Sequence, residues 1–260
     1  MCKLDILFIY YSLKRNLHLN YLIPAVVLLL SISCVHSSGP EEETPGNDKP
    51  DIIVKRRDDG TISSVNQVIN GKIVHGVRAT YYRDGKTLYS KQTYNYGVKH
   101  GPATWYYRSG SVFKLTHFED GKRQGLTRIY YKNGDLLAEF ESEKGNVKPG
   151  LKEYEPDGTL ITSYPEIAFR EIDHLSSGNR VDLEVFCKKR KSGVKFYVLK
   201  EEEEKTSRIY LITENDRALL QYYVKPGASL QKQVDILAEI PTELGNLLVK
   251  KYSYQLNITH

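Results

Sequence analysis

YYRSG, at Tyr106 to Gly110, is one copy of a phrase that this chain repeats. The same phrase reads YYRDG at Tyr81 to Gly85, YYKNG at Tyr130 to Gly134 and YEPDG at Tyr154 to Gly158, and a shortened form, RRDDG, ends at Gly60. The closing glycines are separated by 25, 25, 24 and 24 residues. A period this constant indicates an array of repeated structural units rather than one irregular domain.

Each repeat contains two corners marked by glycine. One is the dipeptide that closes the phrase, such as Asp84-Gly85 or Asn133-Gly134, and we expect a two-residue hairpin turn there because such pairs tolerate positive φ. The other is a looser loop between two glycines, such as Gly97 to Gly101. Two corners per period leave room for two strands of about six to eight residues. The pattern predicts a meander of antiparallel hairpins over residues 53–164.

The spacing G-x-x-x-x-G-x-x-x-x-Y-Y-x-x-G resembles the MORN repeat, and most closely its bacterial variant, found in exported proteins often labelled antitoxin-like. Its leading glycines are Gly76, Gly101, Gly125 and Gly150, each followed by one copy of the phrase. The resemblance covers about residues 58–164 and implies a β-hairpin fold that serves in lipid contact, dimerisation or protein docking. In the last repeat Glu153 and Glu155 replace apolar and aromatic residues. We therefore expect that repeat to cap the array with a polar outer side.

Strand alternation sorts the repeated side chains into two rows. The constant row is expected to hold the sheet together and consists of Tyr81, Tyr106, Tyr130 and Tyr154, together with the corner glycines Gly85, Gly110, Gly134 and Gly158. The opposite row consists of Tyr82, Tyr107 and Tyr131, with Thr80, Trp105 and Ile129. Because the last repeat lacks this second row, we interpret it as the surface that meets a partner. The candidate contacts are Trp105, Tyr107, Tyr131 and Tyr82.

The period ends near Tyr164. Residues 165–260 contain seven short strand-like runs, from PEIAFREIDHL to NLLVKKYSYQL, separated by turn residues. Runs of this number and spacing predict a β-sandwich, Ig-like in the broad sense, and a continuation of the meander with degenerate repeats is the alternative. The expected fold class is all-β, with a MORN-type hairpin meander followed by a β-sandwich.

Residues 1–33 resemble a lipoprotein signal peptide. Lys14 and Arg15 precede an apolar run over residues 21–30, which is shorter than the ~20 residues that a transmembrane helix needs. The junction LSISC resembles the lipobox of bacterial lipoproteins, although Ser31 occupies the usual leucine position, and it implies acylation of Cys34. An uncleaved signal anchor is the alternative. Residues 34–52 are rich in Ser, Gly, Pro and acid and predict a disordered tether.

The sequence contains no recognisable catalytic constellation: it has no Ser-centred elbow, no phosphate-binding glycine loop and no His-x-x-x-His pair. His75 and His100 recur just before a glycine, but no carboxylate or Cys recurs beside them, so we interpret them as loop residues rather than metal ligands. Cys187 lies on the apolar face of a predicted strand, which indicates a buried, inert thiol. The acidic run Glu201 to Glu204 is interpreted as a solvated loop rather than a calcium site.

Charge further limits the function classes. The formal net charge is +5, but Lys and Arg alternate with Asp and Glu and form no basic block, which disfavours nucleic-acid binding. The sequence therefore predicts a non-enzymatic protein without cofactor, metal or small-molecule substrate. It is expected to be lipid-anchored in the bacterial cell envelope, at the outer membrane, and to bind a protein partner through its repeat sheet. An antitoxin or immunity role against an exported toxin and a structural role at the cell surface are the alternatives.

Overall fold

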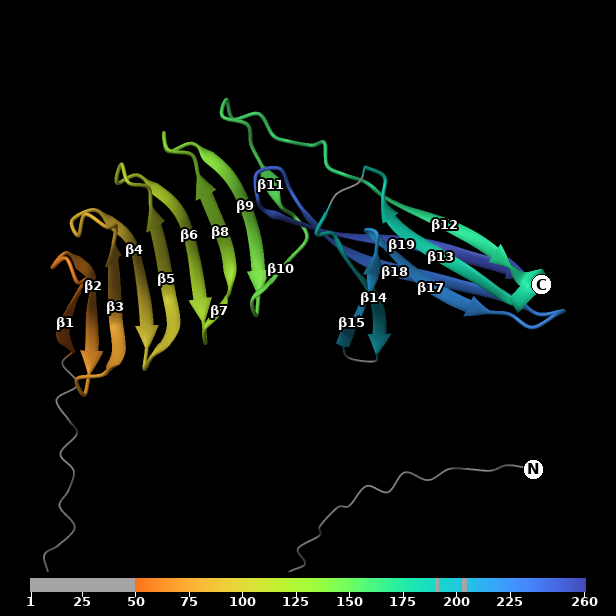
Figure 1. Cartoon of the computed structure of the whole chain (residues 1–260), viewed down its shortest axis with the longest axis horizontal. Coiled ribbons are helices and arrows are strands. Elements are labelled where there is room, and N and C mark those ends of the chain that lie inside the picture. Colours follow the sequence, from red (N-terminus) through yellow and green to blue (C-terminus); the bar gives the residue numbers. More distant parts are fainter. Residues whose placement is uncertain (1–49, 190–191, 203–204) are drawn as a thin grey trace, which may run out of the picture. The chain divides into compact units, whose positions relative to one another are not determined.

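The structure is a computed structural model that describes residues 50–189, 192–202 and 205–260. The expected signal peptide, Cys34 and most of the expected tether lie outside the described residues. Within them β-strands are almost the only regular secondary structure, and they form three sheets (Figure 1). The predicted all-β fold is confirmed.

The repeats form one antiparallel sheet, which has eleven strands in the described part of the chain. Its strands are β1 (Asp51–Arg56), β2 (Ile62–Ile69), β3 (Ile73–Tyr81), β4 (Leu88–Asn95), β5 (Val98–Tyr106), β6 (Val112–Glu119), β7 (Lys122–Arg123), β8 (Gly125–Tyr130), β9 (Leu136–Glu143), β10 (Asn146–Val147) and β11 (Lys152–Glu153). The order from β1 to β6 and on through β8 and β9 follows the chain, and the short strands β7 and β11 pair with β6 and β9 (Figure 1). The predicted meander is confirmed.

The corner that closes the phrase is a three-residue loop in four of its five copies and a four-residue loop after Tyr82, so the predicted two-residue turn is wrong at this place. The Tyr107 amide donates to the Ser111 carbonyl at 2.8 Å, and the Gly110 amide donates to the Tyr107 carbonyl at 2.9 Å. The loop between these partners is residues 108–110. Gly110 has φ +91°, and a left-handed residue at the end of a three-residue hairpin loop is the usual way to close it.

The two-residue turns lie at the other corner, where the sequence predicts a looser loop. Asn95 pairs with Val98, so only Tyr96 and Gly97 form the turn, and both have positive φ, 44° and 83°. Asp120-Gly121 and Lys144-Gly145 form the equivalent turns. Positive φ at both positions defines the type I′ turn that suits the twist of a hairpin. The sequence does not predict this turn because Tyr96 and Lys144 occupy its first position, where type I′ turns prefer Asn, Asp or Gly.

The strand register places Thr80, Ser90, Trp105, Lys114 and Ile129 in one row across the sheet. We call the face that carries this row the Trp105 face, and the opposite face, which carries Leu115, the Leu115 face. A β-bulge interrupts the register between Trp105 and Tyr106, and Phe113 is the extra residue opposite it. The second tyrosine of each phrase comes after the end of its strand, so strand alternation does not place it.

Residues after the repeats form two four-stranded sheets in the described part of the chain. One has the order β12 (Ile167–His174), β13 (Arg180–Cys187), β17 (Arg217–Tyr223) and β16 (Thr213–Glu214), with the short helix α1 (Leu175–Gly178) between β12 and β13. The other has the order β15 (Lys205–Leu211), β14 (Lys195–Glu202), β18 (Ser229–Pro241) and β19 (Leu247–Thr259).

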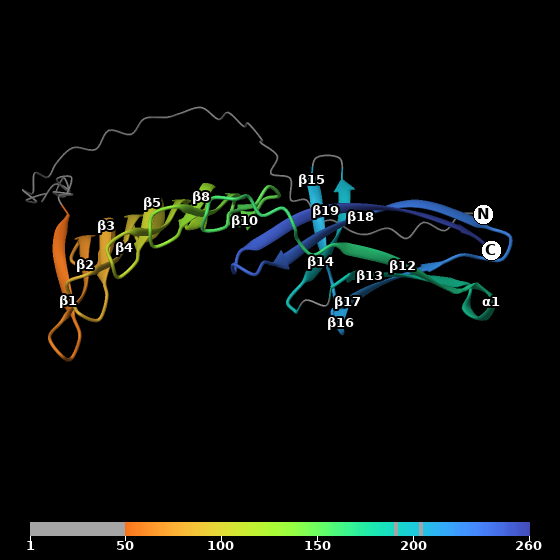
Figure 2. The ribbon, with the colours of Figure 1, turned by 90° about the horizontal axis from the view of Figure 1, so that it is seen from above.

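These two sheets pack face to face (Figure 2). Leu183 from the first sheet and Phe196 and Ile236 from the second are fully buried in one core. Phe169 of β12 stacks on Tyr254 of β19 with ring centroids 4.8 Å apart. The predicted β-sandwich is confirmed.

Candidate functional site

The second tyrosine of each phrase links one repeat to the next. The hydroxyl groups of Tyr82, Tyr107 and Tyr131 donate to the backbone carbonyls of Tyr106, Tyr130 and Tyr154, at 2.7, 2.7 and 2.8 Å. We call these bonds the tyrosine ladder. Burial raises the pKa of Tyr107 and Tyr131, so both phenols remain protonated donors at neutral pH.

Arg57 provides the same link in the first, shortened phrase. Its Nη2 donates to the Tyr81 carbonyl at 2.8 Å, which is the acceptor position that the ladder uses in the later repeats. Its Nη1 donates to the Ile62 carbonyl at 2.7 Å. A guanidinium therefore replaces the phenol, and RRDDG is a complete member of the array. Sequence reasoning missed this role, although Arg57 precedes Gly60 by the same three residues that separate Tyr82 from Gly85.

Three of the four residues predicted to contact a partner form the tyrosine ladder. Their hydroxyl groups are hydrogen-bonded to backbone carbonyls of the next repeat, and each side chain is partly buried; these residues are Tyr82, Tyr107 and Tyr131. Trp105 differs because it lies within β5, in the row that defines the Trp105 face, and is also partly exposed. The constant row supplies the carbonyl acceptors of the ladder. A role in partner contact stays a prediction for all four residues.

Cations and aromatic rings lie together on the Trp105 face. The distances from cation to ring centroid are 5.1 Å for Lys99 over Phe118, 5.6 Å for Lys114 over Trp105 and 6.0 Å for Arg123 over Phe140. These distances fall within the range of cation–π attraction. The Tyr107 ring meets Phe113 edge-on, with centroids 5.1 Å apart. This part of the sheet therefore combines aromatic rings and one arginine, which are residue types enriched at binding surfaces, with two lysines.

Among the residues that the structure describes, Lys114 and Arg123 have no acidic partner on this face. In residues 50–189 and the described part of the sandwich, neither forms an ion pair. Burial lowers the pKa of Lys114, and the positive charge of Arg123 lowers it further. Two neighbouring cations without a carboxylate between them create a region that favours an anion.

Glu153 joins the repeat sheet to the sandwich, so the expectation of a polar outer side is wrong for this residue, whereas Glu155 is exposed as expected. Its side chain is only 1% exposed. Its Oε1 accepts hydrogen bonds from Thr242 Oγ1 and Asn246 Nδ2, both at 2.6 Å. Thr242 and Asn246 belong to the turn between β18 and β19. The residue that breaks the repeat pattern is therefore the residue that fixes this turn to the last repeats.

A cleft lies between the Trp105 face and the β18–β19 turn. Ile129, Leu137 and Phe140 line it from the sheet, Leu244 lines it from the turn, and Leu247 lines it from the start of β19. Lys114 and Arg123 also line it. Its volume is about 480 Å³, which is within the range of small-molecule sites. The cleft thus has apolar walls from two parts of the chain and a positive charge on one side.

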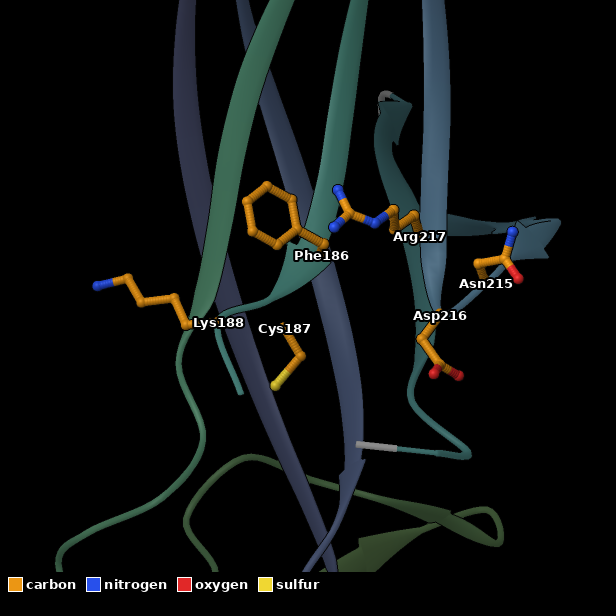
Figure 3. Close-up of a pocket in the computed structure, with 6 residues that line it drawn as sticks. All are labelled: Phe186, Cys187, Lys188, Asn215, Asp216 and Arg217. Atoms are coloured by element: carbon orange, nitrogen blue, oxygen red, sulfur yellow. The ribbon is translucent and has the colours of Figure 1, made fainter. Parts of the chain in front are cut away.

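A second pocket lies at the end of the sandwich, around Cys187 (Figure 3). Figure 3 shows the Arg217 guanidinium directed toward Phe186, and its distance to the ring centroid is 4.9 Å. Arg217 Nη1 also donates to Glu184 at 2.9 Å. The Cys187 thiol is buried, as the sequence predicts. Arg217 is thus occupied by neighbours that stabilise the sheet.

The prediction that the repeated histidines lie in loops is wrong, because His75 lies in β3 and His100 lies in β5, each near the start of its strand. The Tyr96 amide donates to His75 Nδ1 at 3.4 Å, and the two rings lie 4.7 Å apart. His100 Nδ1 lies 3.7 Å from an Asp120 carboxylate oxygen at the surface. In the described residues no group of three or more His, Cys, Asp or Glu side chains could hold a metal ion. The side chains of Glu201 to Glu204 lie outside the described structure.

Comparison with known proteins agrees with the repeat geometry. The MORN repeat variant family matches residues 99–120, which span β5, the Tyr106-Tyr107 phrase and β6. This segment therefore carries a MORN repeat, and the ladder extends the same geometry to its neighbours. A search of curated proteins gave no match.

Proposed function

We propose that the protein is a non-enzymatic binding module whose Trp105 face docks a protein partner. The observation that carries this proposal is the cluster around Trp105 and Lys114 of partly exposed aromatic rings and of cations that form no ion pair within the described residues. Aromatic residues and arginine supply most of the energy at protein interfaces, because they combine large apolar area with polar or charged groups.

The opposite face is a poorer candidate. Near the sandwich it is occupied by ion pairs, in which Glu139 contacts Arg128 at 3.5 Å and Lys152 at 3.1 Å. A charged side chain in such a pair has to give up its present partner before it can bind another. The repeat sheet therefore favours one face for docking.

We further propose that the protein is a lipid-anchored component of the bacterial cell envelope. The support is the lipobox-like junction before Cys34, which lies outside the described residues. No helix in the described residues is long and apolar enough to span a membrane. Replacing Cys34 with Ser should move the protein from the membrane pellet to the soluble fraction. Retention in the pellet would favour an uncleaved signal anchor.

A structural role through self-association is a second candidate, favoured by the free edge of β1. Ile52 is 68% exposed and Val54 45% exposed on this strand, which pairs only with β2 in the described structure. An unpaired edge with exposed apolar residues is a template for another strand. Light scattering over a range of concentrations would reveal a dimer, and an Ile52→Lys variant would abolish it.

Partner docking is tested by chemical crosslinking in intact cells followed by purification. Trp105→Ser should abolish recovery of the partner. Leu115→Ser, on the opposite face of the same sheet, is the matched control and should leave recovery unchanged. Equal recovery of the partner with both variants would show that the contact surface does not lie on the Trp105 face.

A further inference from the structure

We propose that the cleft between the Trp105 face and the β18–β19 turn binds a small anionic amphiphile, a molecule with one carboxylate and an apolar body. This proposal goes beyond partner docking and does not depend on it. It rests on three features of the cleft: its two cations, its apolar walls, and the way Glu153 holds the turn in place.

The cations select a negative charge. Lys114 and Arg123 both line the cleft, and the described residues place no carboxylate in ion-pair contact with either. Each cation instead lies over an aromatic ring, Trp105 or Phe140, which leaves the donor hydrogens free to bind an anion. A carboxylate between them would reduce their mutual repulsion and form charge-assisted hydrogen bonds, the stronger class of hydrogen bond.

The walls select an apolar body. Ile129 and Phe140 form part of the buried core, and Leu137 packs against it. Leu244 faces them from the turn and is 38% exposed. An aliphatic chain in the cleft would remove its own apolar surface and that of Leu244 from water, at about 25 cal/mol per Å². A simple inorganic anion could not gain this contribution.

The frame of the cleft is fixed before any ligand arrives. Glu153 accepts two hydrogen bonds from side chains of the turn. The backbone N–H of Asn246 also donates a hydrogen bond to Thr242 Oγ1 at 3.0 Å. A wall that is already ordered loses little conformational entropy on binding. A volume of about 480 Å³ between two ordered walls suits a small molecule better than a folded protein surface.

Octanoate is a suitable probe, with octylamine and octan-1-ol as cationic and neutral controls of the same chain length. Calorimetry measures affinity. Tryptophan emission reports location, because Trp105 is the only tryptophan in the chain and lies beside Lys114. We expect octanoate to bind and to change the emission, and octylamine to show no binding. Octan-1-ol should bind about ten- to a hundredfold more weakly than octanoate, the range for loss of a charged hydrogen bond.

Three variants complete the test. Lys114→Met should weaken octanoate binding about tenfold or more, and Leu244→Glu should do the same by placing a negative charge on the opposite wall. Leu244 is partly exposed, so this variant is expected to fold. Lys99→Met is the matched control, because Lys99 makes a similar cation–π contact on the same face but does not line the cleft. The affinity of Lys99→Met for octanoate should equal that of the wild type.

Several outcomes would overturn the proposal. Equal affinity for octanoate and octan-1-ol would show that the cations do not select the ligand. Calorimetric binding without any change in Trp105 emission would place the ligand elsewhere. No binding of octanoate, together with binding of a short acidic peptide that contains apolar residues, would assign the cleft to a peptide segment instead.

Discussion

Replacing Tyr107 with Phe should destabilise the repeat sheet, whereas replacing its neighbour Tyr106 with Phe should not. The two residues adjoin in one phrase and would lose the same atom. The Tyr107 hydroxyl donates to the Tyr130 carbonyl at 2.7 Å, and the described structure records no hydrogen bond for the Tyr106 hydroxyl. The pair of variants therefore isolates the contribution of one bond of the tyrosine ladder.

The expected magnitude follows from the kind of bond. A neutral intramolecular hydrogen bond contributes about 1 kcal/mol net, within a range of about 0.5 to 1.5. Tyr107→Phe should therefore lower the unfolding free energy by about 1 kcal/mol, and Tm should fall by about 2 to 4 °C for a protein of this size. Tyr106→Phe should change the unfolding free energy by less than about 0.5 kcal/mol, as expected for a surface substitution.

A triple variant tests whether the ladder acts along the whole array. Converting Tyr82, Tyr107 and Tyr131 to Phe together should lower the unfolding free energy by about 3 kcal/mol, provided that the three bonds are additive. Urea unfolding followed by circular dichroism provides the measurement, with the native spectrum as a check on fold. Equal effects of Tyr106→Phe and Tyr107→Phe would refute the assignment of the second tyrosine to the ladder.

Three further predictions concern single groups. Glu153→Ala should lower the unfolding free energy, measured by urea unfolding, by about 3 kcal/mol, because two hydrogen bonds to a carboxylate are lost. An effect under about 0.5 kcal/mol would contradict the role of Glu153 in holding the β18–β19 turn against the repeat sheet. Burial, and then the Glu153 carboxylate, raises the pKa of Tyr164 to about 12. The stability that the neutral Tyr164 phenol contributes should therefore be complete below about pH 10 and lost as pH rises toward 12. In Tyr164→Phe, the ultraviolet absorbance of tyrosinate should show one late-titrating phenol fewer than in the wild type. Hydrogen bonds from the Thr87 and Lys86 amides lower the pKa of Asp84 to about 2, so Asp84→Asn should be less stable than the wild type at pH 5 and equally stable near pH 2, as measured by urea unfolding.

The sequence was sufficient to predict the repeat fold because its signals are local. The spacing of Gly85, Gly110 and Gly134 marks a corner that requires positive φ in every repeat, and all three glycines have it. The alternating strands between the corners follow from the same period. The sandwich was predictable for a similar reason, since its strands are short and separated by turn residues.

The turn types were harder to predict because they depend on how the strands pair. Tyr96 and Lys144 adopt positive φ in type I′ turns although neither residue favours it. The twist of the paired strands on either side requires the conformation, and the pairing is not visible in the residues of the turn. For the same reason strand alternation alone does not place Tyr107, which follows the end of β5.

The cleft could not be predicted at all, since its walls come from distant parts of the chain. Lys114 and Arg123 lie in the repeats, and Leu244 lies in a turn of the sandwich more than a hundred residues later. Glu153 was noticed as a departure from the pattern but interpreted as a surface residue. Only the fold shows that Thr242 and Asn246 meet it.

Site-specific photocrosslinking on strand β6 tests partner docking most directly. Phe113 and Leu115 are each 37% exposed, and they lie on the Trp105 face and the Leu115 face respectively. A photoreactive amino acid would replace each in turn in cells that naturally make the protein. We predict a discrete crosslinked product from position 113 and none from position 115. A discrete product from position 115 alone would contradict the assignment of the Trp105 face as the docking surface.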